Sequence, residues 1–438
     1  MNLNKFLNDN LIYQIISFSK KINIDIYFVG GCVRDTILGI KSHDIDIVPF
    51  GIDYREFSKI LKKKLNASAV PFKDNVRLYV NNTVIDVSKP RGETISDDLQ
   101  KRDFTINNLA MDKNGNIIGD TTDIDKRLIK HVYEEVFQDD PIRILRAFRF
   151  ASQLGFQIDI ETLNKIYHEK ELLKNAPNER IYDEIIKLLK RNYNFNALKM
   201  MQQSEVLFIL YPEFKKIEGL PQGKYHKDCA LTHTFKVVEL MQFMAEKLNL
   251  SDQTKNILLL TALFHDVGKG FTGEKNNYKN FIGHEIESVK IAKKYLTKYP
   301  INKNQINTIL LLIENHTKIR IYSTETARDN TLKKFIYKHY PYLEELILFT
   351  LADNLTKGKS MEPIYQTIIR IREFAKLMHW ERKNLITGHD LMQLPIEDKK
   401  MFSTILNDVH EKLVIGVLNS KDEAIKYIKS QYIIQKQS

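Results

Sequence analysis

The apolar pattern changes once along this chain, near residue 132, and that change limits the folds open to it. Before it, short apolar runs at residues 24–29 and 44–50 alternate with helix-like stretches, and hairpin signals surround Asn81-Asn82 and Asn114-Gly115. From about residue 132 the strand signal disappears, and apolar residues recur at spacings of three and four. The pattern predicts an α+β multidomain protein, with a small mixed-sheet head followed by all-helical domains.

Length divides the chain further, because 438 residues exceed the size of one ordinary core. We predict a head over residues 1–131, a helical neck over 132–217, a third helical domain over 218–358 and a helical tail over 359–438. The main linker candidate is the segment 218–229, which carries Gly219, Pro221 and Gly223. A softer boundary falls within residues 356–363.

Charge and cysteine content indicate the partners and the compartment. The 66 Lys+Arg against 55 Asp+Glu leave a net charge of +11, which favours a nucleic-acid partner, although a lysine-rich genome produces the same bias. Cys32 and Cys229 lack the spacing of a disulfide scaffold, so we expect reduced thiols in a cytoplasmic protein. No apolar run approaches the roughly 18 residues that span a bilayer, so no membrane anchor is expected. The oligomeric state stays open.

The stretch VGGCVRDTILGIKSHDIDIV holds the densest group of chemistry-bearing residues. Gly30 and Gly31 follow a strand and precede a helix, so backbone N–H groups there can approach phosphates, and Arg34 adds a cation. Asp44 and Asp46 point to one face of a strand, and such close acids are tolerated where Mg²⁺ neutralises them. Either feature alone is more often a plain turn or a solvated strand end, but in this order they predict in-line nucleotidyl transfer.

A third catalytic acid is expected to complete such a site. Asp86 lies at the centre of the otherwise apolar strand TVIDVS, and its side chain points away from those of Ile85 and Val87. It therefore faces the side that can join the other two acids. The alternative is an edge-strand acid that faces water.

Five motifs in order resemble the class II tRNA nucleotidyltransferase and poly(A) polymerase family, of the CCA-adding type. They are VGGCVRDTILG, HDIDIV, KRDFTINNLAMD, DDPIRILRAFRFASQLGF and NERIYDEI, and ITGHDLMQL is similar to the tRNA-facing tail of CCA-adding enzymes. The resemblance implies a polymerase beta-like head, with Mg²⁺ held at the aspartates. It also implies a nucleotidyltransferase that adds CCA to tRNA 3′ ends from CTP and ATP without a nucleic-acid template.

Carried over by position, the resemblance implies roles for further residues. Arg102 and Asp103 would select the ribose 2′-OH, with a surface ion pair as the alternative. Asp140 and Arg143 would read the base, because a carboxylate accepts from the amino group that cytosine and adenine share. A solvated arginine stripe on an amphipathic helix is the alternative there. The predicted set is Asp44, Asp46 and Asp86 for catalysis, and Gly30, Gly31, Arg34, Asp35, Arg102, Asp103, Asp140, Arg143, Arg146 and Arg149 for nucleotide binding.

The segment SKPRGETISDDLQKRDFT is shorter than the family's usual excursion before RDFT, a loop implicated in the switch from C to A addition. A shortened loop resembles enzymes that add only CC. CC addition therefore stays an alternative, with poly(A) synthesis as a second one.

A second constellation lies downstream, and its order resembles the HD phosphohydrolase domain. Histidine and carboxylate ligands suit Mn, Fe, Co, Ni or Mg better than a structural zinc, and two metals are expected. The implied activity is removal of terminal or 2′,3′-cyclic phosphates from RNA 3′ ends. A histidine that only packs between helices is the alternative for each position, His284 above all. The predicted ligands are His233, His265, Asp266, His284, His316 and Asp353.

A function from another class also stays open, in which an HD phosphohydrolase carries a non-catalytic RNA-binding head. The intact acids Asp44 and Asp46 argue against it. Lysines and aromatic residues alternate in KKFIYKHYPYLEE and EAIKYIKSQYIIQK, where they can follow phosphates and stack a base. On helices such stretches are more often core plus solvated face.

Overall fold

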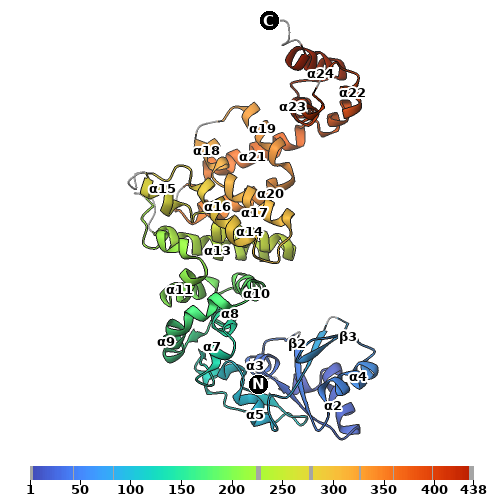
Figure 1. Cartoon of the computed structure of the whole chain (residues 1–438), viewed down its shortest axis with the longest axis vertical. Coiled ribbons are helices and arrows are strands. Elements are labelled where there is room, and N and C mark those ends of the chain that lie inside the picture. Colours follow the sequence, from blue (N-terminus) through green and yellow to red (C-terminus); the bar gives the residue numbers. More distant parts are fainter. Residues whose placement is uncertain are drawn as a thin grey trace. The chain divides into compact units, whose positions relative to one another are not determined.

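The computed structural model describes residues 3–42, 44–81, 83–222, 228–275, 280–324, 327–358, 360–396 and 398–433. Strands are concentrated in the N-terminal part, blue in Figure 1, and helices make up the remainder, which confirms the predicted fold class. The chain divides into two compact units, Met1–Lys215 and Lys216–Ser438. That boundary falls close to the predicted start of the third domain, and the finer four-part division stays a prediction.

Within the described residues, seven strands form one mixed sheet in the order β3-β4-β5-β2-β1-β6-β7. β2 runs parallel to β5, and the other neighbours are antiparallel. Both predicted hairpins are confirmed, as β4–β5 and β6–β7, although Asn82 lies outside the described residues. The strands are β1 (Asp25–Val29), β2 (Asp44–Phe50), β3 (Ser68–Pro71), β4 (Asn75–Val80), β5 (Thr83–Ser88), β6 (Ala110–Met111) and β7 (Ile117–Ile118).

Alternation along β2 fixes how the sheet presents its acids. Ile45 and Ile47 are buried in the core, so Asp44 and Asp46 project from the opposite face. A slip of one residue would bury both carboxylates in the apolar core, which makes this register strongly specified. The helices of the sheet-containing region are α1 (Leu3–Leu7), α2 (Asn10–Lys21), α3 (Gly31–Leu38), α4 (Tyr54–Leu65) and α5 (Ile95–Gln100).

The rest of the first unit is helical apart from one short pair of strands. β8 (Leu128–Ile129) pairs in parallel with β9 (Gln157–Ile158), so the expectation of no strand after residue 132 is wrong at β9. Two residues are too few to leave a periodic signal. The helices are α6 (Thr122–Asp125), α7 (Val136–Asp139), α8 (Ile142–Leu154), α9 (Ile160–Glu169), α10 (Asn178–Leu189), α11 (Asn194–Gln203) and α12 (Val206–Leu210), and α8 packs against α10 and α11.

Helices make up the second unit, and its last part has an apolar core of its own that includes Leu391, Val409 and Leu413. None of the described helices is both long and apolar enough to cross a bilayer. Of the predicted linker 218–229, residues 223–227 lie outside the described chain. The helices are α13 (Ala230–Lys247), α14 (Asp252–Phe264), α15 (Lys269–Lys275), α16 (His284–Leu296), α17 (Lys303–Asn315), α18 (Lys318–Thr324), α19 (Asp329–His339), α20 (Leu343–Leu355), α21 (Glu362–Leu377), α22 (Gly388–Met392), α23 (Phe402–Val414) and α24 (Lys421–Ile428).

The end of α8 offers a test of this packing. Gly155 closes the helix with a φ of +69°, and a Cβ there would lie 2.8 Å from the Tyr193 ring. Gly155→Ala is expected to cost about 1–2 kcal/mol for the left-handed backbone, and more for displacing the ring. Thermal unfolding followed by circular dichroism should show a lower Tm. The double variant with Tyr193→Ala removes the collision and should keep only the backbone cost; an unchanged Tm in the single variant would contradict this packing.

Candidate active site and candidate metal centre

The first unit contains a cavity of about 580 Å³ that is lined by charged side chains. It lies where β1, β2 and β5 meet α3, α8 and α10, so residues far apart in sequence share its wall. The structure brings together every residue that the sequence assigned to nucleotidyl transfer, while their roles stay predictions. Those residues are Gly30, Gly31, Arg34, Asp35, Asp44, Asp46, Asp86, Arg102, Asp103, Asp140, Arg143, Arg146 and Arg149.

The glycine turn between β1 and α3 shapes one side of this cavity. Gly30 has a φ of +68°, and its N–H donates to the Leu109 carbonyl at 2.9 Å. A Cβ at Gly30 would lie 3.0 Å from Nη1 of Arg102. The position therefore suits glycine for its backbone conformation and for the close approach of an arginine.

Crowded carboxylates form a second side of the cavity. The parallel pairing of β2 and β5 sets Asp46 opposite Asp86, and Asp44 lies two residues away on the same face. Burial, and next the negative charge of Asp86, raise the pKa of Asp46 to about 6, and Asp44 adds to the effect. Such a group of acids is a fitting site for a divalent cation, which would relieve the repulsion.

Asp86 differs from its expected state in one respect. Its carboxylate accepts hydrogen bonds from Arg77 Nε at 2.9 Å and Nη2 at 2.8 Å, and from Asn75 Nδ2 at 3.0 Å. The third acid is therefore already partnered, and Arg77 offsets part of its charge. Sequence reasoning missed Arg77 and Asn75. The signal was present, because both alternate with the apolar residues Val76 and Leu78 on the neighbouring hairpin strand.

Arg34 is only 3% exposed, and its guanidinium is held by neighbours. Nε and Nη2 donate to Asp35 Oδ1 at 2.9 and 2.7 Å, and Nη1 donates to Asn107 Oδ1 at 2.7 Å. The predicted contact of Arg34 with a triphosphate therefore involves an arginine that already pairs with Asp35. Both side chains are fixed in the cavity wall.

Arg102 and Asp103 do not pair with each other. Arg102 binds Asp98 of α5 through Nε and Nη2 at 3.0 and 2.6 Å, whereas Asp103 binds Arg146 of α8 through Nε and Nη2 at 2.8 and 2.6 Å. Burial opposes ionisation of Asp103, but Arg146 and a hydrogen bond from Asn107 hold its pKa well below the usual range. The simple Arg-Asp pair is thus replaced by two separate ion pairs, which tie this motif to α5 and α8.

The arginine stripe of α8 faces the cavity while Ile142, Leu145 and Phe148 are buried on the other side. Phe150 lies beneath several guanidinium groups, with the Arg149 carbon 3.9 Å from its ring centre. Arg146 lies 5.3 Å from the same centre. This cation–π packing holds the arginines side by side despite their like charge.

Helix α10 contributes residues that sequence reasoning missed. Arg180 donates to both oxygens of Asp140, at 3.0 and 2.8 Å, and Glu184 accepts from Arg149 Nε at 2.6 Å. Arg143 instead donates to the Tyr133 hydroxyl at 2.5 Å. The available signal was the charged spacing of four, three and four in NERIYDEIIKLLKR, which marks one helix face. The residues of this series at the cavity are Arg180, Glu184 and Lys187 of α10, and Arg191, which follows the end of the helix.

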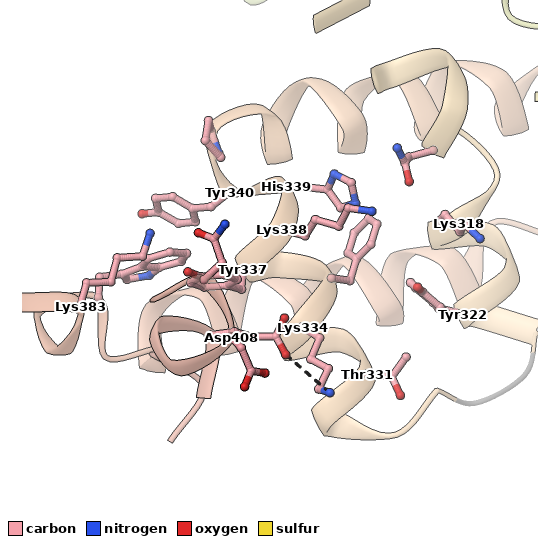
Figure 2. A pocket seen from close by; sticks show the side chains of 16 residues that line it. Lys318, Tyr322, Thr331, Lys334, Tyr337, Lys338, His339, Tyr340, Lys383 and Asp408 are labelled. Carbon is pink, nitrogen blue, oxygen red and sulfur yellow. Dashed lines mark ion pairs between the residues drawn. The ribbon is translucent and has the colours of Figure 1, made fainter. Parts of the chain in front are cut away.

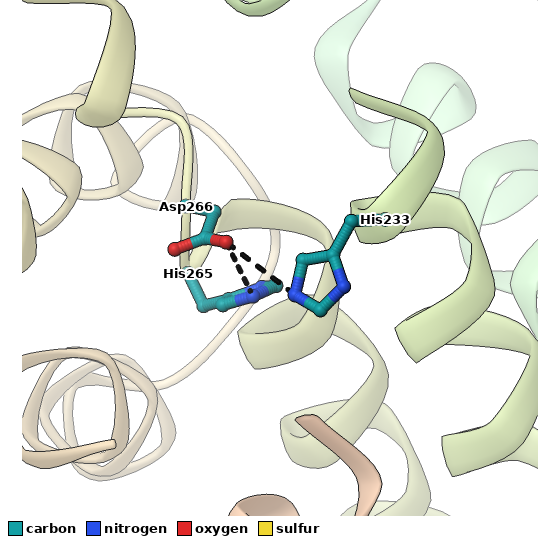
Figure 3. Close-up of side chains that lie close together, drawn as sticks. All are labelled: His233, His265 and Asp266. Atoms are coloured by element: carbon teal, nitrogen blue, oxygen red, sulfur yellow. Dashed lines mark ion pairs between the residues drawn. The ribbon is translucent and has the colours of Figure 1, made fainter. Parts of the chain in front are cut away.

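The second constellation gathers at one buried point of the second unit. Figure 3 shows that one carboxylate oxygen of Asp266 faces the rings of both His265 and His233. This oxygen, Oδ2, lies 3.2 Å from His265 Nε2 and 3.5 Å from His233 Nε2. Asp353 closes the group, with Oδ1 3.0 Å from His233 Nε2 and 3.7 Å from His265 Nε2. Each of these side chains is at most 2% exposed.

The other oxygen of Asp266 serves a second group. Oδ1 lies 3.2 Å from His284 Nε2 and 3.8 Å from His316 Nε2, and the two Nε2 atoms are 3.3 Å apart. His284 therefore lies inside the cluster and is not a remote packing residue. Two overlapping ligand sets share Asp266, which is the arrangement that a bridging carboxylate gives to a pair of metal ions.

Backbone carbonyls orient three of the four histidine rings through their Nδ1 atoms. Nδ1 of His265, His284 and His316 donates to the carbonyls of Ala262, Phe281 and Ile313, at 2.9, 2.8 and 2.7 Å. Such bonds fix the tautomer and leave Nε2 as a lone-pair donor that points inward. The Nε2 of His265 is buried and makes no hydrogen bond of good geometry, and the carboxylate oxygen Asp266 Oδ2 lies 3.2 Å from it. Burial, then His284, holds the pKa of His316 well below normal, so this ring is neutral.

Two lysines that the sequence did not single out accompany the acids. Lys269 donates to Asp266 Oδ2 at 2.5 Å, and Lys357 donates to Asp353 Oδ2 at 2.5 Å. Asp266 lies in the turn between α14 and α15, where Lys269 begins α15, and Lys357 lies just beyond the end of α20, which contains Asp353. They partly neutralise the carboxylates and bring cationic N–H donors to the cavity beside the cluster.

Three family models match successive parts of the chain. They are the poly A polymerase head domain over residues 26–130, the probable RNA and SrmB-binding site of polymerase A over 155–218, and the HD domain over 230–358. A Multifunctional CCA protein of Actinobacillus pleuropneumoniae serotype 5b is 31% identical over 67% of this chain and 75% of the relative. This chain belongs to the CCA-adding tRNA nucleotidyltransferase family.

Other members of the CCA-adding family match over nearly the whole length. A CC-adding tRNA nucleotidyltransferase of Thermus thermophilus is 27% identical over 92% of this chain and 93% of its own. The solved Thermotoga maritima CCA-adding enzyme complexed with tRNA shares the fold, with a TM-score of 0.62, 22% identity and 98% of each chain covered. A CCA-adding enzyme solved with CTP matches with a TM-score of 0.66 and 22% identity, over 98% of this chain and 97% of its own. The predicted family is thus confirmed.

Metal content offers a direct test of the histidine cluster in this family member. His265→Ala removes the Nε2 atom that His265 offers to the ligand group of His233, His265 and Asp266. The content of tightly bound transition metal should therefore fall below about half of the wild-type content. Metal analysis of the protein after dialysis with Mn²⁺ measures it. His410→Ala, whose ring contacts the Ile386 carbonyl outside the cluster, is the matched control. Equal metal in both variants would rule out the cluster as a metal centre.

Proposed function

We propose that this chain adds CCA to the 3′ ends of tRNA, using CTP and ATP. The observation that carries the proposal is the set of Asp44, Asp46 and Asp86 at the edge of an arginine-lined cavity. Relatives named Multifunctional CCA protein, and similar structures of a CCA-adding enzyme with CTP and with ATP, support this substrate class. A cytoplasmic location stays a prediction.

The residues of the cavity suit the parts of such a reaction. Asp44 and Asp46 would hold Mg²⁺, which supplies charge neutralisation at the phosphates and a more acidic primer hydroxyl. Around it, the backbone N–H groups of the first turn of α3, which begins at Gly31, and the arginines of α8 would bind the triphosphate. Because Asp103 is ionised beside Arg146, it can accept a hydrogen bond from a ribose hydroxyl.

Base selection would fall to Asp140 and Arg143. Arg180 donates to both oxygens of the Asp140 carboxylate, so an incoming amino group would share an oxygen with Arg180 or replace one of its two hydrogen bonds. Cytosine and adenine both offer an amino donor next to an acceptor, whereas guanine and uracil present the opposite pattern. Protein side chains would thereby replace a nucleic-acid template.

A second candidate, addition of CC only, is favoured by the segment before Arg102. This segment is short, and hydrogen bonds hold it in place. α5 begins with a capping box of Thr94 and Asp97, and the Asp98 carboxylate accepts hydrogen bonds from the Arg91 backbone N–H and from Arg102. A Cβ at Gly92 would lie 2.2 Å from the Asp97 Cβ, so the segment is also closely packed. The similarity to the CC-adding Thermus thermophilus protein over 92% of this chain supports the same candidate.

For the histidine cluster we propose a metal-dependent phosphohydrolase that acts on RNA 3′ ends. The convergence of buried histidine Nε2 atoms on the oxygens of Asp266, which belongs to both groups of candidate ligands, supports metal binding, with Mn, Co, Ni, Fe or Mg as the ion. A bound divalent metal supplies a water of lowered pKa near neutral pH. Lys269 and Lys357 would add charged donors for phosphate oxygens.

Counting the nucleotides added to tRNA that lacks CCA decides between the candidates. With labelled CTP alone we expect two residues, and with CTP and ATP together we expect a third, because one base-reading pair accepts both amino-bearing bases. Gel resolution of the products measures the count. Two residues under both conditions would replace the first candidate by the second, and a long run of A would replace both by poly(A) synthesis.

Substituting one acid separates the two active centres. Asp46→Ala removes a metal-holding carboxylate, so nucleotide incorporation should fall on the order of 10³-fold, while phosphate release from a 3′-phosphorylated RNA stays at the wild-type rate. Incorporation and phosphate release are measured on the same preparation. Asp123→Ala, in the same unit but outside the cavity lining, serves as control. Unchanged incorporation in Asp46→Ala would exclude this mechanism.

A further inference from the structure

A second large cavity of the second unit has no role in the chemistry above. It encloses about 890 Å³ between α18 and α19 on one side and residues 380–383 and α23 on the other. Figure 2 shows lysines and aromatic side chains around it, with Tyr340 and Lys383 toward one end and Lys318 and Tyr322 toward the other. It is large enough for a nucleotide-sized ligand.

Aromatic rings form a stack at one end of this cavity. The Tyr337 and Trp380 planes are 9° apart with centres at 6.0 Å, and the Tyr340 centre lies 3.9 Å from that of Trp380. Lys383 Nζ lies 4.8 Å from the Tyr337 ring centre and 5.4 Å from that of Trp380. The Tyr340 ring is tilted by 37° from the Trp380 plane, and Tyr340 is 47% exposed, so an exposed aromatic ring on which a base could stack ends this group.

The charged side chains of the lining that have no ion-pair partner among the described residues are lysines. Glu411 lies 3.5 Å from Lys334, and Asp408 accepts from Lys412 at 2.5 Å, so both acids of the lining are engaged. Lys318 and Lys338 have no carboxylate within ion-pair distance among the described residues. Exposed lysines beside an aromatic stack are the features of a single-stranded nucleic-acid site, where cations follow phosphates and rings stack bases.

This cavity adjoins the one at the histidine cluster. The cluster cavity encloses about 750 Å³ and reaches Asp266, His284 and His316. Asn315, Lys318 and Lys338 line both cavities, so the lysines stand at the junction between them.

The cluster cavity carries a further unpaired cation. Arg320 lines it, and its Nε is buried without a hydrogen-bond partner. An arginine in that state is a donor that a phosphate oxygen would satisfy. One continuous path thus runs from the aromatic stack, past Lys338 and Lys318, to the metal-ligand cluster.

We propose that this path binds the last nucleotides of a single-stranded RNA 3′ end and delivers its terminal phosphate to the histidine cluster. The inference rests on the proposed phosphohydrolase role and adds to it the surface that binds the RNA, which would favour a polynucleotide end over a free nucleotide. A 3′-phosphate would lose its P–O3′ ester bond to water, giving inorganic phosphate and a 3′-hydroxyl. That hydroxyl is the group that nucleotidyl transfer consumes.

Trp380 reports on binding directly, because it is the only tryptophan of the chain. Titration of the wild-type protein with a 3′-phosphorylated oligoribonucleotide should quench its fluorescence, and a mononucleotide 3′-phosphate should bind at least about tenfold more weakly. Tyr340→Ala should weaken oligonucleotide binding about tenfold, and Tyr340→Phe, which keeps the ring, should retain it. Equal affinities of the oligonucleotide for wild type and Tyr340→Ala would overturn the proposal, as would binding of an acidic peptide in preference to RNA.

Kinetics separate this proposal from the phosphohydrolase activity itself. For Lys338→Ala the ratio of kcat/KM on the oligonucleotide to kcat/KM on p-nitrophenyl phosphate should fall about fivefold, with the loss in KM. Lys376→Ala removes an exposed lysine outside both cavities, and it should leave both the ratio of kcat/KM values and the KM for the oligonucleotide unchanged. A proportional loss on both substrates would overturn the path. If wild type hydrolyses neither substrate with any of the metals, the proposed activity fails, and the fluorescence titration still decides whether RNA binds.

Discussion

The parallel pairing of β2 with β5 is the contact on which the first site depends. It sets Asp46 opposite Asp86 at the sheet surface, where both carboxylates lose much of their water. Burial first, and then the like charge of Asp86, disfavour the ionised form of Asp46 and raise its pKa to about 6. The surrounding arginines offset part of this charge, and a divalent cation bound there would stabilise the ionised form further.

Ion pairs then carry this constraint outward. Arg77 reaches Asp86 from the hairpin, Arg102 reaches Asp98 on α5, and Arg146 joins Asp103 to α8. Removing one partner of a buried ion pair leaves an uncompensated charge. These contacts therefore fix the position of α8 relative to β2 and β5 within the first unit. Ion pairs, as well as apolar packing, therefore determine the form of the cavity in the first unit.

The same logic governs the second unit with different ligands. Four histidines and two aspartates converge at a buried point, and backbone carbonyls that accept from Nδ1 of His265, His284 and His316 leave the Nε2 atoms of these three rings as lone-pair donors. Lys269 and Lys357 offset part of the carboxylate charge. The remaining lone pairs need a cation, so a cluster that would be unfavourable in an apolar core is consistent with a metal centre.

Sequence patterns by themselves determined the α+β class, both hairpins, the glycine turn and the members of both clusters, because periodicity and local motifs are properties of short segments. They did not reveal that Arg102 and Asp103 bind different partners, that Arg77 engages Asp86, or that Arg180 supports Asp140. Those pairings join residues that become neighbours only when strands and helices pack. Only the tertiary structure decided them, and with them the junction of the lysine-lined cavity with the histidine cluster, because ion pairs and cavities depend on distances across the fold.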